Sequence, residues 1–183
     1  MGNRGCLHDA AGRIRRSFVG ARWIICVLEF KARRRPLMVP GHYTELFFLD
    51  EATALAAGHR PCMECQRGRY RLFREHWRAP GGRGAPSAPD LDAALHAERL
   101  ASGHERRTYL EQLSRLPDGA MVIDDGRAQL VRAGTLLPWT PQGYAADAAH
   151  AAATAAVRVL TPRSIVQAIA RGYPVAIHPS AAR

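Results

Sequence analysis

The alternation of apolar and polar residues in the first part of the chain predicts strands joined by turns. The run RWIICVLEF (22–30) is short, apolar and rich in β-branched residues, and YTELFFL (43–49) alternates loosely. A turn is expected around Gly12, and a basic loop punctuated by prolines separates the two predicted strands.

The next two segments have the pattern of helices. Residues 50–57 begin at Asp50, a good N-cap, and Gly58 supplies a left-handed stop. Residues 63–77 carry one apolar stripe at helical spacing, which predicts the second helix. The stripe consists of Tyr70, Phe73 and Trp77.

The second half of the chain predicts a mixture of helices and short strands. Residues 79–89 are rich in proline and glycine and indicate a linker. Helical patterns resume at 90–101 and 104–116, and a helix over 161–172 has proline in its first turn and glycine at its end. Apolar segments predict strands at 120–123, 127–131, 135–139, 157–160 and 173–178.

Composition and charge indicate the class of partner. The chain has 183 residues, 47% of them apolar and 23% charged, which is typical of a globular protein. The formal net charge is +10, and arginine carries it because Lys31 is the only lysine. Since the guanidinium fork suits phosphates and base edges, we expect DNA or RNA as the partner. The expected basic face comprises Arg33, Arg34, Arg35, Arg60, Arg67 and Arg71.

Several classes of location and chemistry are disfavoured. No apolar run reaches the ~18 residues of a membrane span, and no secretory signal is visible, so we expect a cytoplasmic protein with no membrane partner. In that compartment the four cysteines favour metal binding or redox chemistry over disulfides. We find no P-loop, Rossmann turn, nucleophile elbow or paired-carboxylate site, which favours a binding protein over an enzyme.

A CxxC pair in the stretch RPCMEC is the strongest chemical signal. Cys62 and Cys65 are spaced to bind one zinc ion when the second cysteine opens a helix. A redox CxxC would follow the first strand of a βαβ unit, whereas here a complete helix over 50–57 precedes the pair. The sequence therefore favours Zn²⁺ as the cofactor, with two unliganded thiols as the alternative.

A closed zinc site needs two more ligands. Cys26, in the middle of the strand predicted over 22–30, is the best candidate for the third. His8 and Cys6 share a strand face and compete for the fourth position, and His59 is a further option. We favour His8.

The stretch LFFLDEATALAAGHRPCMEC resembles the second half of the metal-binding domain of the Ada family of bacterial alkylation-response proteins. The resemblance covers residues 43–78: a strand, a short helix with an EA…AG pattern, an RPCxxC knuckle and a further helix. It implies that Cys62 and Cys65 bind zinc and that the surrounding basic surface faces DNA. It also implies upstream ligands, which would fall on His8 and Cys26.

These observations together predict an α+β protein. A small zinc-binding β-hairpin and helix module would occupy 1–78, a linker 79–89, and a helical pair with a small mixed α/β portion 90–183. We expect a zinc-binding protein that contacts nucleic acid, in DNA damage response if the resemblance holds. Two alternatives remain. One is a stoichiometric methyl acceptor that takes a methyl group from a DNA phosphotriester onto Cys26, and the other is a zinc-stabilised structural or protein-interaction module.

Overall fold

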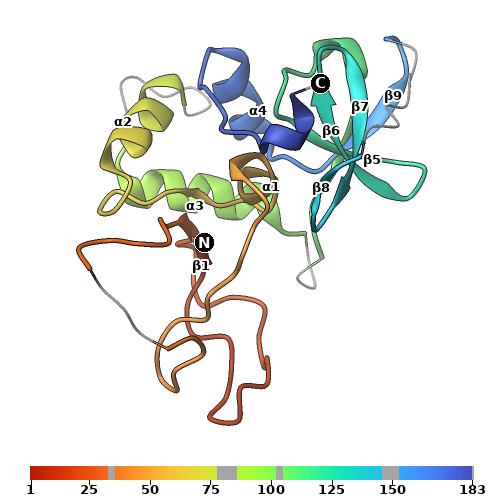
Figure 1. The fold of residues 1–183 in the computed structure, drawn as a ribbon. Helices are drawn as coiled ribbons and strands as arrows, with labels where there is room; N and C mark the ends of the chain where they lie inside the picture. The colour runs from red at the N-terminus through yellow and green to blue at the C-terminus, as the bar shows by residue number, and fades with distance from the viewer. Residues whose placement is uncertain (33–35, 78–85, 102–104, 146–152, 183) are drawn as a thin grey trace.

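The computed structural model describes residues 1–32, 36–77, 86–101, 105–145 and 153–182. Within these residues the protein is a mixed α+β structure, as Figure 1 shows, and it has four α-helices and two sheets. The α-helices are α1 (Glu51–Ala56), α2 (Arg67–His76), α3 (Ala88–Arg99) and α4 (Arg163–Ala170). Among the described residues, every helix is too short or too polar to traverse a lipid bilayer.

A small sheet of two-residue strands brings three distant segments together. Its order is β1 (Gly2–Asn3), β2 (Ile24–Ile25) and β3 (Arg60–Pro61). Strands β1 and β2 are antiparallel, whereas β2 and β3 are parallel and align Ile25 with Pro61. Because a cysteine follows both β2 and β3, this register brings Cys26 and Cys62 to the same end of the sheet.

The second sheet is antiparallel and has six strands. Its order is β4 (Tyr109–Gln112), β9 (Ala156–Val159), β5 (Met121–Asp124), β6 (Arg127–Arg132), β7 (Thr135–Thr140) and β8 (Gly143–Tyr144). Helix α1 packs against this sheet through Ala52 and Ala56, which contact Met121 and Leu130 in one buried cluster. Val166 of α4 belongs to a second cluster on the sheet.

The main core joins the predicted module to the rest of the chain. Its buried residues come from β2, from all four helices and from the segment after α4, and they include Ile25, Leu55, Phe73, Leu95, Ile165 and Tyr173. The apolar stripe predicted for α2 is confirmed, because Tyr70, Phe73 and Trp77 are all buried. Helix α3 begins at Ala88, inside the segment expected to be a linker.

Helix ends follow the expected capping chemistry. The Asp50 side chain accepts a hydrogen bond from the backbone of Thr53, and the Thr53 hydroxyl oxygen accepts one from the Asp50 backbone N–H. This reciprocal capping box starts α1 at the position that the sequence predicts.

The helix predicted over 104–116 is wrong. Instead, β4 pairs with β9, aligning Tyr109 with Val159, and a short 3₁₀ turn, Leu113–Arg115, follows. The leucines of this segment recur at helical spacing, but Leu113 and Leu116 pack against the sheet in one buried cluster without forming an α-helix. The pairing with β9 therefore overrides local propensity.

Three predicted strands are shorter or missing. Only Ile24 and Ile25 of 22–30 pair within a strand, and 43–49 makes one bridge, between Leu46 and Gly2. Residues 173–178 form no strand, since their backbone groups bond to the start of α1. The N–H of Ala176 donates to Glu51 and that of His178 to Asp50. The remaining predicted strands appear as β5, β6, β7 and β9.

Candidate metal centre

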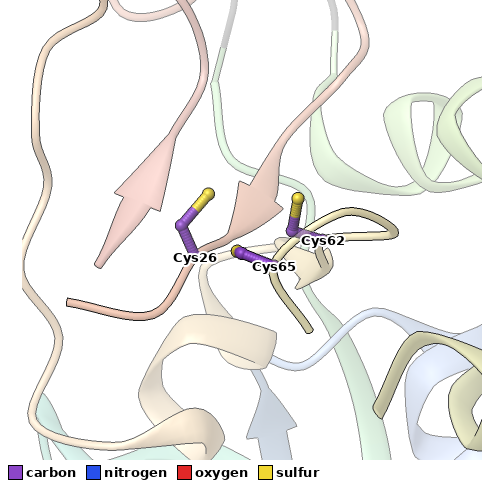
Figure 2. A group of neighbouring side chains, drawn as sticks. All are labelled: Cys26, Cys62 and Cys65. Carbon is purple, nitrogen blue, oxygen red and sulfur yellow. The ribbon is translucent and has the colours of Figure 1, made fainter. Parts of the chain in front are cut away.

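Three cysteine side chains converge at the junction of β2, β3 and α2. The Sγ atoms of Cys26, Cys62 and Cys65 all lie within 4.8 Å of one another, and Figure 2 shows them gathered from the two segments that carry them. None of these cysteines forms a disulfide. Cys62 is buried, while Cys26 and Cys65 are partly exposed.

Backbone hydrogen bonds hold the two segments in this register. The N–H of Cys62 donates to the carbonyl of Ile25 at 2.9 Å, which locks the residue after β3 to the end of β2. The side-chain amide of Gln66 donates to the same carbonyl at 3.0 Å, and its backbone N–H donates to the carbonyl of Cys62 at 3.1 Å. The loop between the two knuckle cysteines is thereby fixed against Cys26.

The electrostatics of the cluster favour one thiolate at Cys62. A hydrogen bond from Cys26 lowers the pKa of Cys62 to about 5, with help from the backbone N–H groups of Cys65 and Glu64. The Glu64 amide donates to the Cys62 Sγ at 3.4 Å. In return the pKa of Cys26 is raised, by its hydrogen bond to Cys62 and by burial, and burial raises the pKa of Cys65. These hydrogen bonds stabilise a thiolate, and thiolate sulfur is a soft ligand that suits a soft cation.

The spacing of the sulfur atoms suits a tetrahedral zinc ion. A Zn–S bond of ~2.3 Å in tetrahedral geometry places sulfur atoms about 3.8 Å apart, so the cluster needs to contract by less than about 1 Å. Within the described part of the chain, no fourth His, Cys, Asp or Glu side chain belongs to this group. The described residues thus offer a metal ion three cysteine sulfur atoms.

The candidates for the fourth ligand lie elsewhere. His8 is buried, with Nδ1 at 2.6 Å from the Thr44 hydroxyl and Nε2 at 3.3 Å from the Val39 carbonyl. The Cys6 thiol donates to the carbonyl of His8 at 3.5 Å. His59 is enclosed by aromatic rings. None of the three belongs to the cysteine group.

His59 is a fully buried histidine held in its neutral form. Its ring lies 4.9 Å from that of Phe48 and 5.5 Å from that of Trp23, centroid to centroid. Neither ring nitrogen makes a hydrogen bond of good geometry to a described residue. Burial lowers its pKa well below the usual 6.5, and the charges of Arg4 and Arg99 add to this, although backbone groups of Ala54 and Ala57 partly offset it.

We therefore expect His59 to make the fold sensitive to acid. The unfolded chain protonates this ring below pH 6.5 and the folded chain does not, so stability is full above pH 6.5 and falls as the pH drops below it. Below pH 6.5, the free energy of unfolding of the wild type should fall by about 1.4 kcal/mol more per pH unit than that of His59→Phe. Denaturant unfolding of both metal-loaded proteins at about pH 7.5, 6.0 and 5.5, above and below the unfolded pKa, measures this difference. Parallel pH profiles of the two proteins would contradict the prediction.

The arginines predicted to contact nucleic acid differ in their exposure to solvent. Arg33, Arg34 and Arg35 lie outside the described residues. Arg60 is buried, with 1% of its surface exposed, and forms a bidentate ion pair with Asp92. It is therefore not part of any basic surface. Arg67 and Arg71 are exposed on α2, directly after the cysteine knuckle.

A second group of arginines was missed at the sequence level. Arg4 and Arg99 are separated by about half of the chain, yet both guanidinium groups lie 4.5 Å from the ring centroid of Trp23. No spacing rule links these positions, because a tertiary contact between the first residues and the end of α3 brings them together.

Comparison with protein-family models, with curated proteins and with solved structures found no match for this chain.

Proposed function

We propose that the protein binds one Zn²⁺ ion through Cys26, Cys62 and Cys65. The observation that carries this proposal is the convergence of three sulfur atoms within 4.8 Å from two segments far apart in the sequence. Thiolates favour zinc over the hard cations, and a lowered pKa at Cys62 supplies a thiolate at neutral pH.

The first role of the ion would be structural. It would clamp the end of β2 to the loop before α2, where the small sheet contributes only two residues per strand. Such short strands supply little stability, and a bound metal contributes folding free energy directly. We propose that this zinc site keeps the loop-rich first part of the chain docked on the main core.

The second part of the proposal is contact with nucleic acid beside the metal. Exposed Arg67 and Arg71 lie on one side of α2, within two turns of Cys65, in a chain of net charge +10. Guanidinium groups recognise phosphates, and a role in DNA damage response follows only from the resemblance to Ada-type domains.

Binding of a short DNA duplex is expected to weaken steeply with salt. Each phosphate contact contributes about −0.9 to the slope of log K against log salt. The double variant Arg67→Ala, Arg71→Ala should therefore flatten this slope by about 2, while Arg115→Ala, an exposed arginine distant in sequence, should flatten it little. Fluorescence anisotropy over a series of salt concentrations measures the slope. Binding that does not depend on salt, or equal slopes of log K against log salt for all variants, would contradict the proposed contact with nucleic acid.

The methyl-acceptor alternative also uses this cluster. Cys26 is partly exposed and stands on a different segment from the knuckle pair, as expected for a sulfur atom that an electrophile must reach, and zinc coordination would hold it as a thiolate. Methyl transfer would break a C–O bond of a phosphotriester, form an S–C bond at Cys26 and release a phosphodiester. Intact-mass analysis after incubation with methylated DNA separates this alternative: it requires one added methyl group per chain, located on Cys26.

A further inference from the structure

A small cavity lies where the first residues of the chain meet the end of α3. Its volume is about 200 Å³. Residues from the turn after α1, the end of α3 and the approach to α4 line it, together with Ser17, Phe18 and Trp23. Four arginines face it: Arg4, Arg99, Arg106 and Arg107.

Arg99 is the innermost of these arginines, with only 4% of its surface exposed. Its Nε donates to the carbonyl of Gly58 and its Nη1 to the carbonyl of Ala21, both at 2.6 Å. Nη2 is buried and has no hydrogen-bond partner among the described residues. Arg99 thus lines the cavity with a guanidinium that is held by two carbonyls and keeps one donor that no described residue accepts.

Arg4 doubles the positive charge at this point. Its guanidinium and that of Arg99 each lie 4.5 Å from the ring centroid of Trp23, and its buried Nε also has no partner among the described residues. Burial lowers the pKa of Arg99 to about 9; the charges of Asp92 and Glu98 act to raise it, whereas those of Arg60 and Arg4 lower it further. Burying two guanidinium groups beside one ring, each with an N–H donor that lacks an acceptor, costs folding free energy unless an anion binds between them.

The lining residues supply little compensating negative charge. Glu98 is the only acidic side chain among them, and its Oε2 accepts hydrogen bonds from the backbone N–H and the hydroxyl of Ser164, at 3.0 and 2.9 Å. Arg106 directs its Nη2 to the carbonyls of Ala56 and Leu160. The cavity therefore keeps an excess of positive charge and unpaired N–H donors.

We propose that this cavity binds the phosphate group of a phosphate monoester. Several guanidinium forks match a group that carries about −1.5 to −2 charge and three terminal oxygens at pH 7 better than they match a single carboxylate. The volume is below the ~300 Å³ at which pockets enclose whole small molecules, so the phosphate enters and the group that bears it stays outside. Phe18 lines the same cavity and offers an aromatic contact to that group.

The phosphate can come from a free monoester or from the 5′ end of a nucleic acid. The second source rests on the proposed function, because it assumes nucleic-acid contact, whereas the pocket itself does not involve the cysteine centre. The two sources are separated by the probes: inorganic phosphate, a nucleoside monophosphate, and one oligonucleotide carrying either a 5′-phosphate or a 5′-hydroxyl.

Calorimetric titration of the zinc-loaded wild type with these probes tests the proposal, with the intrinsic tryptophan fluorescence, to which Trp23 contributes, as a second readout. We expect saturable binding of at least one phosphate monoester, weakened about tenfold or more by Arg4→Ala and by Arg107→Ala, since each removes a charge-assisted contact. Arg115→Ala, which removes one exposed arginine outside the cavity, should bind as the wild type does. Arg107 is exposed, so this variant should fold even if Arg4→Ala does not.

Each outcome has one meaning. Stronger binding of the 5′-phosphate over the 5′-hydroxyl oligonucleotide, lost in Arg107→Ala, supports the pocket with nucleic acid as the source. Binding of the mononucleotide or phosphate alone supports it with a small ligand. No binding of any monoester, or binding that Arg107→Ala and Arg115→Ala weaken equally, overturns it. A wild-type protein that takes up no zinc but binds phosphate would refute the metal centre and leave this pocket intact.

Discussion

Replacing Cys62 with serine is expected to abolish stoichiometric zinc binding, and Cys26→Ser and Cys65→Ser should weaken it strongly. Each change removes one of the three sulfur atoms that the structure gathers within 4.8 Å. Loss of a residue that only supports a ligand costs about 10–100-fold in metal affinity, so loss of a direct ligand should cost at least about 100-fold. Native mass spectrometry and elemental analysis of each purified variant measure this.

The controls for this experiment come from the chain itself. Cys6→Ser removes a thiol that faces the carbonyl of His8, and His8→Ala removes a ring that bonds to Thr44 and Val39. Both variants should keep one zinc per chain. A folded wild-type protein that does not bind added zinc, or a Cys62→Ser variant that binds zinc as tightly as the wild type, would refute the Cys26–Cys62–Cys65 centre.

Zinc removal should also lower stability. Structural zinc sites in small peptides contribute about 10–16 kcal/mol of apparent free energy, although a domain with its own core depends on the metal less. The main core here includes residues from all four helices, so we expect a chelator to lower the melting temperature rather than unfold the chain outright.

Asp92→Ala is expected to destabilise the fold by about 3–5 kcal/mol, the second large effect. The Asp92 carboxylate accepts two hydrogen bonds from Arg60, at 2.9 and 2.7 Å, and the arginine side chain is 1% exposed. Removing the carboxylate leaves a buried cation without its counter-ion, while Arg60 keeps only its bond to the Pro61 carbonyl and its position 5.3 Å from the Tyr70 ring. Denaturant unfolding measures the loss.

A matched control and a rescue make this prediction specific. Arg115→Ala breaks an ion pair to Glu111 in which the arginine is 69% exposed, so it should cost at most about 1 kcal/mol. The double change Arg60→Met, Asp92→Leu replaces both charges with apolar groups and should recover most of the stability. If Asp92→Ala and Arg115→Ala were equally mild, the ion pair would not hold β3 to α3.

Local chemistry made several features predictable. The Asp50 cap and the stop at Gly58 delimit α1. Gly58 has a φ of +81°, and a Cβ at this position would collide with the side chain of Arg99. The stripe of α2 predicted its buried face, and the apolar segments 120–123 and 127–131 predicted the strands that pair as β5 and β6. These are features in which residues near in sequence interact with one another.

Long-range pairing decided what the pattern of residues could not. The segment over 104–116 has leucines at helical spacing, yet β9 supplies a partner for β4 and makes it a strand. Residues 173–178 have the composition of a strand, but their N–H groups bond to Asp50 and Glu51 at the start of α1. Arg60 looks like a surface cation in the sequence, and only the position of α3 supplies the buried carboxylate that makes it a core residue.

The same division holds for the two candidate sites. The sequence by itself determined that Cys62 and Cys65 form a knuckle, because a helix that starts after two cysteines three residues apart aims both at one point. It singled out Cys26, but only the parallel pairing of β2 with β3 placed that thiol beside the knuckle and left His8 bonded to Thr44. The arginine cavity was visible only in the tertiary structure, since burial and desolvation depend on packing between distant segments rather than on spacing along the chain.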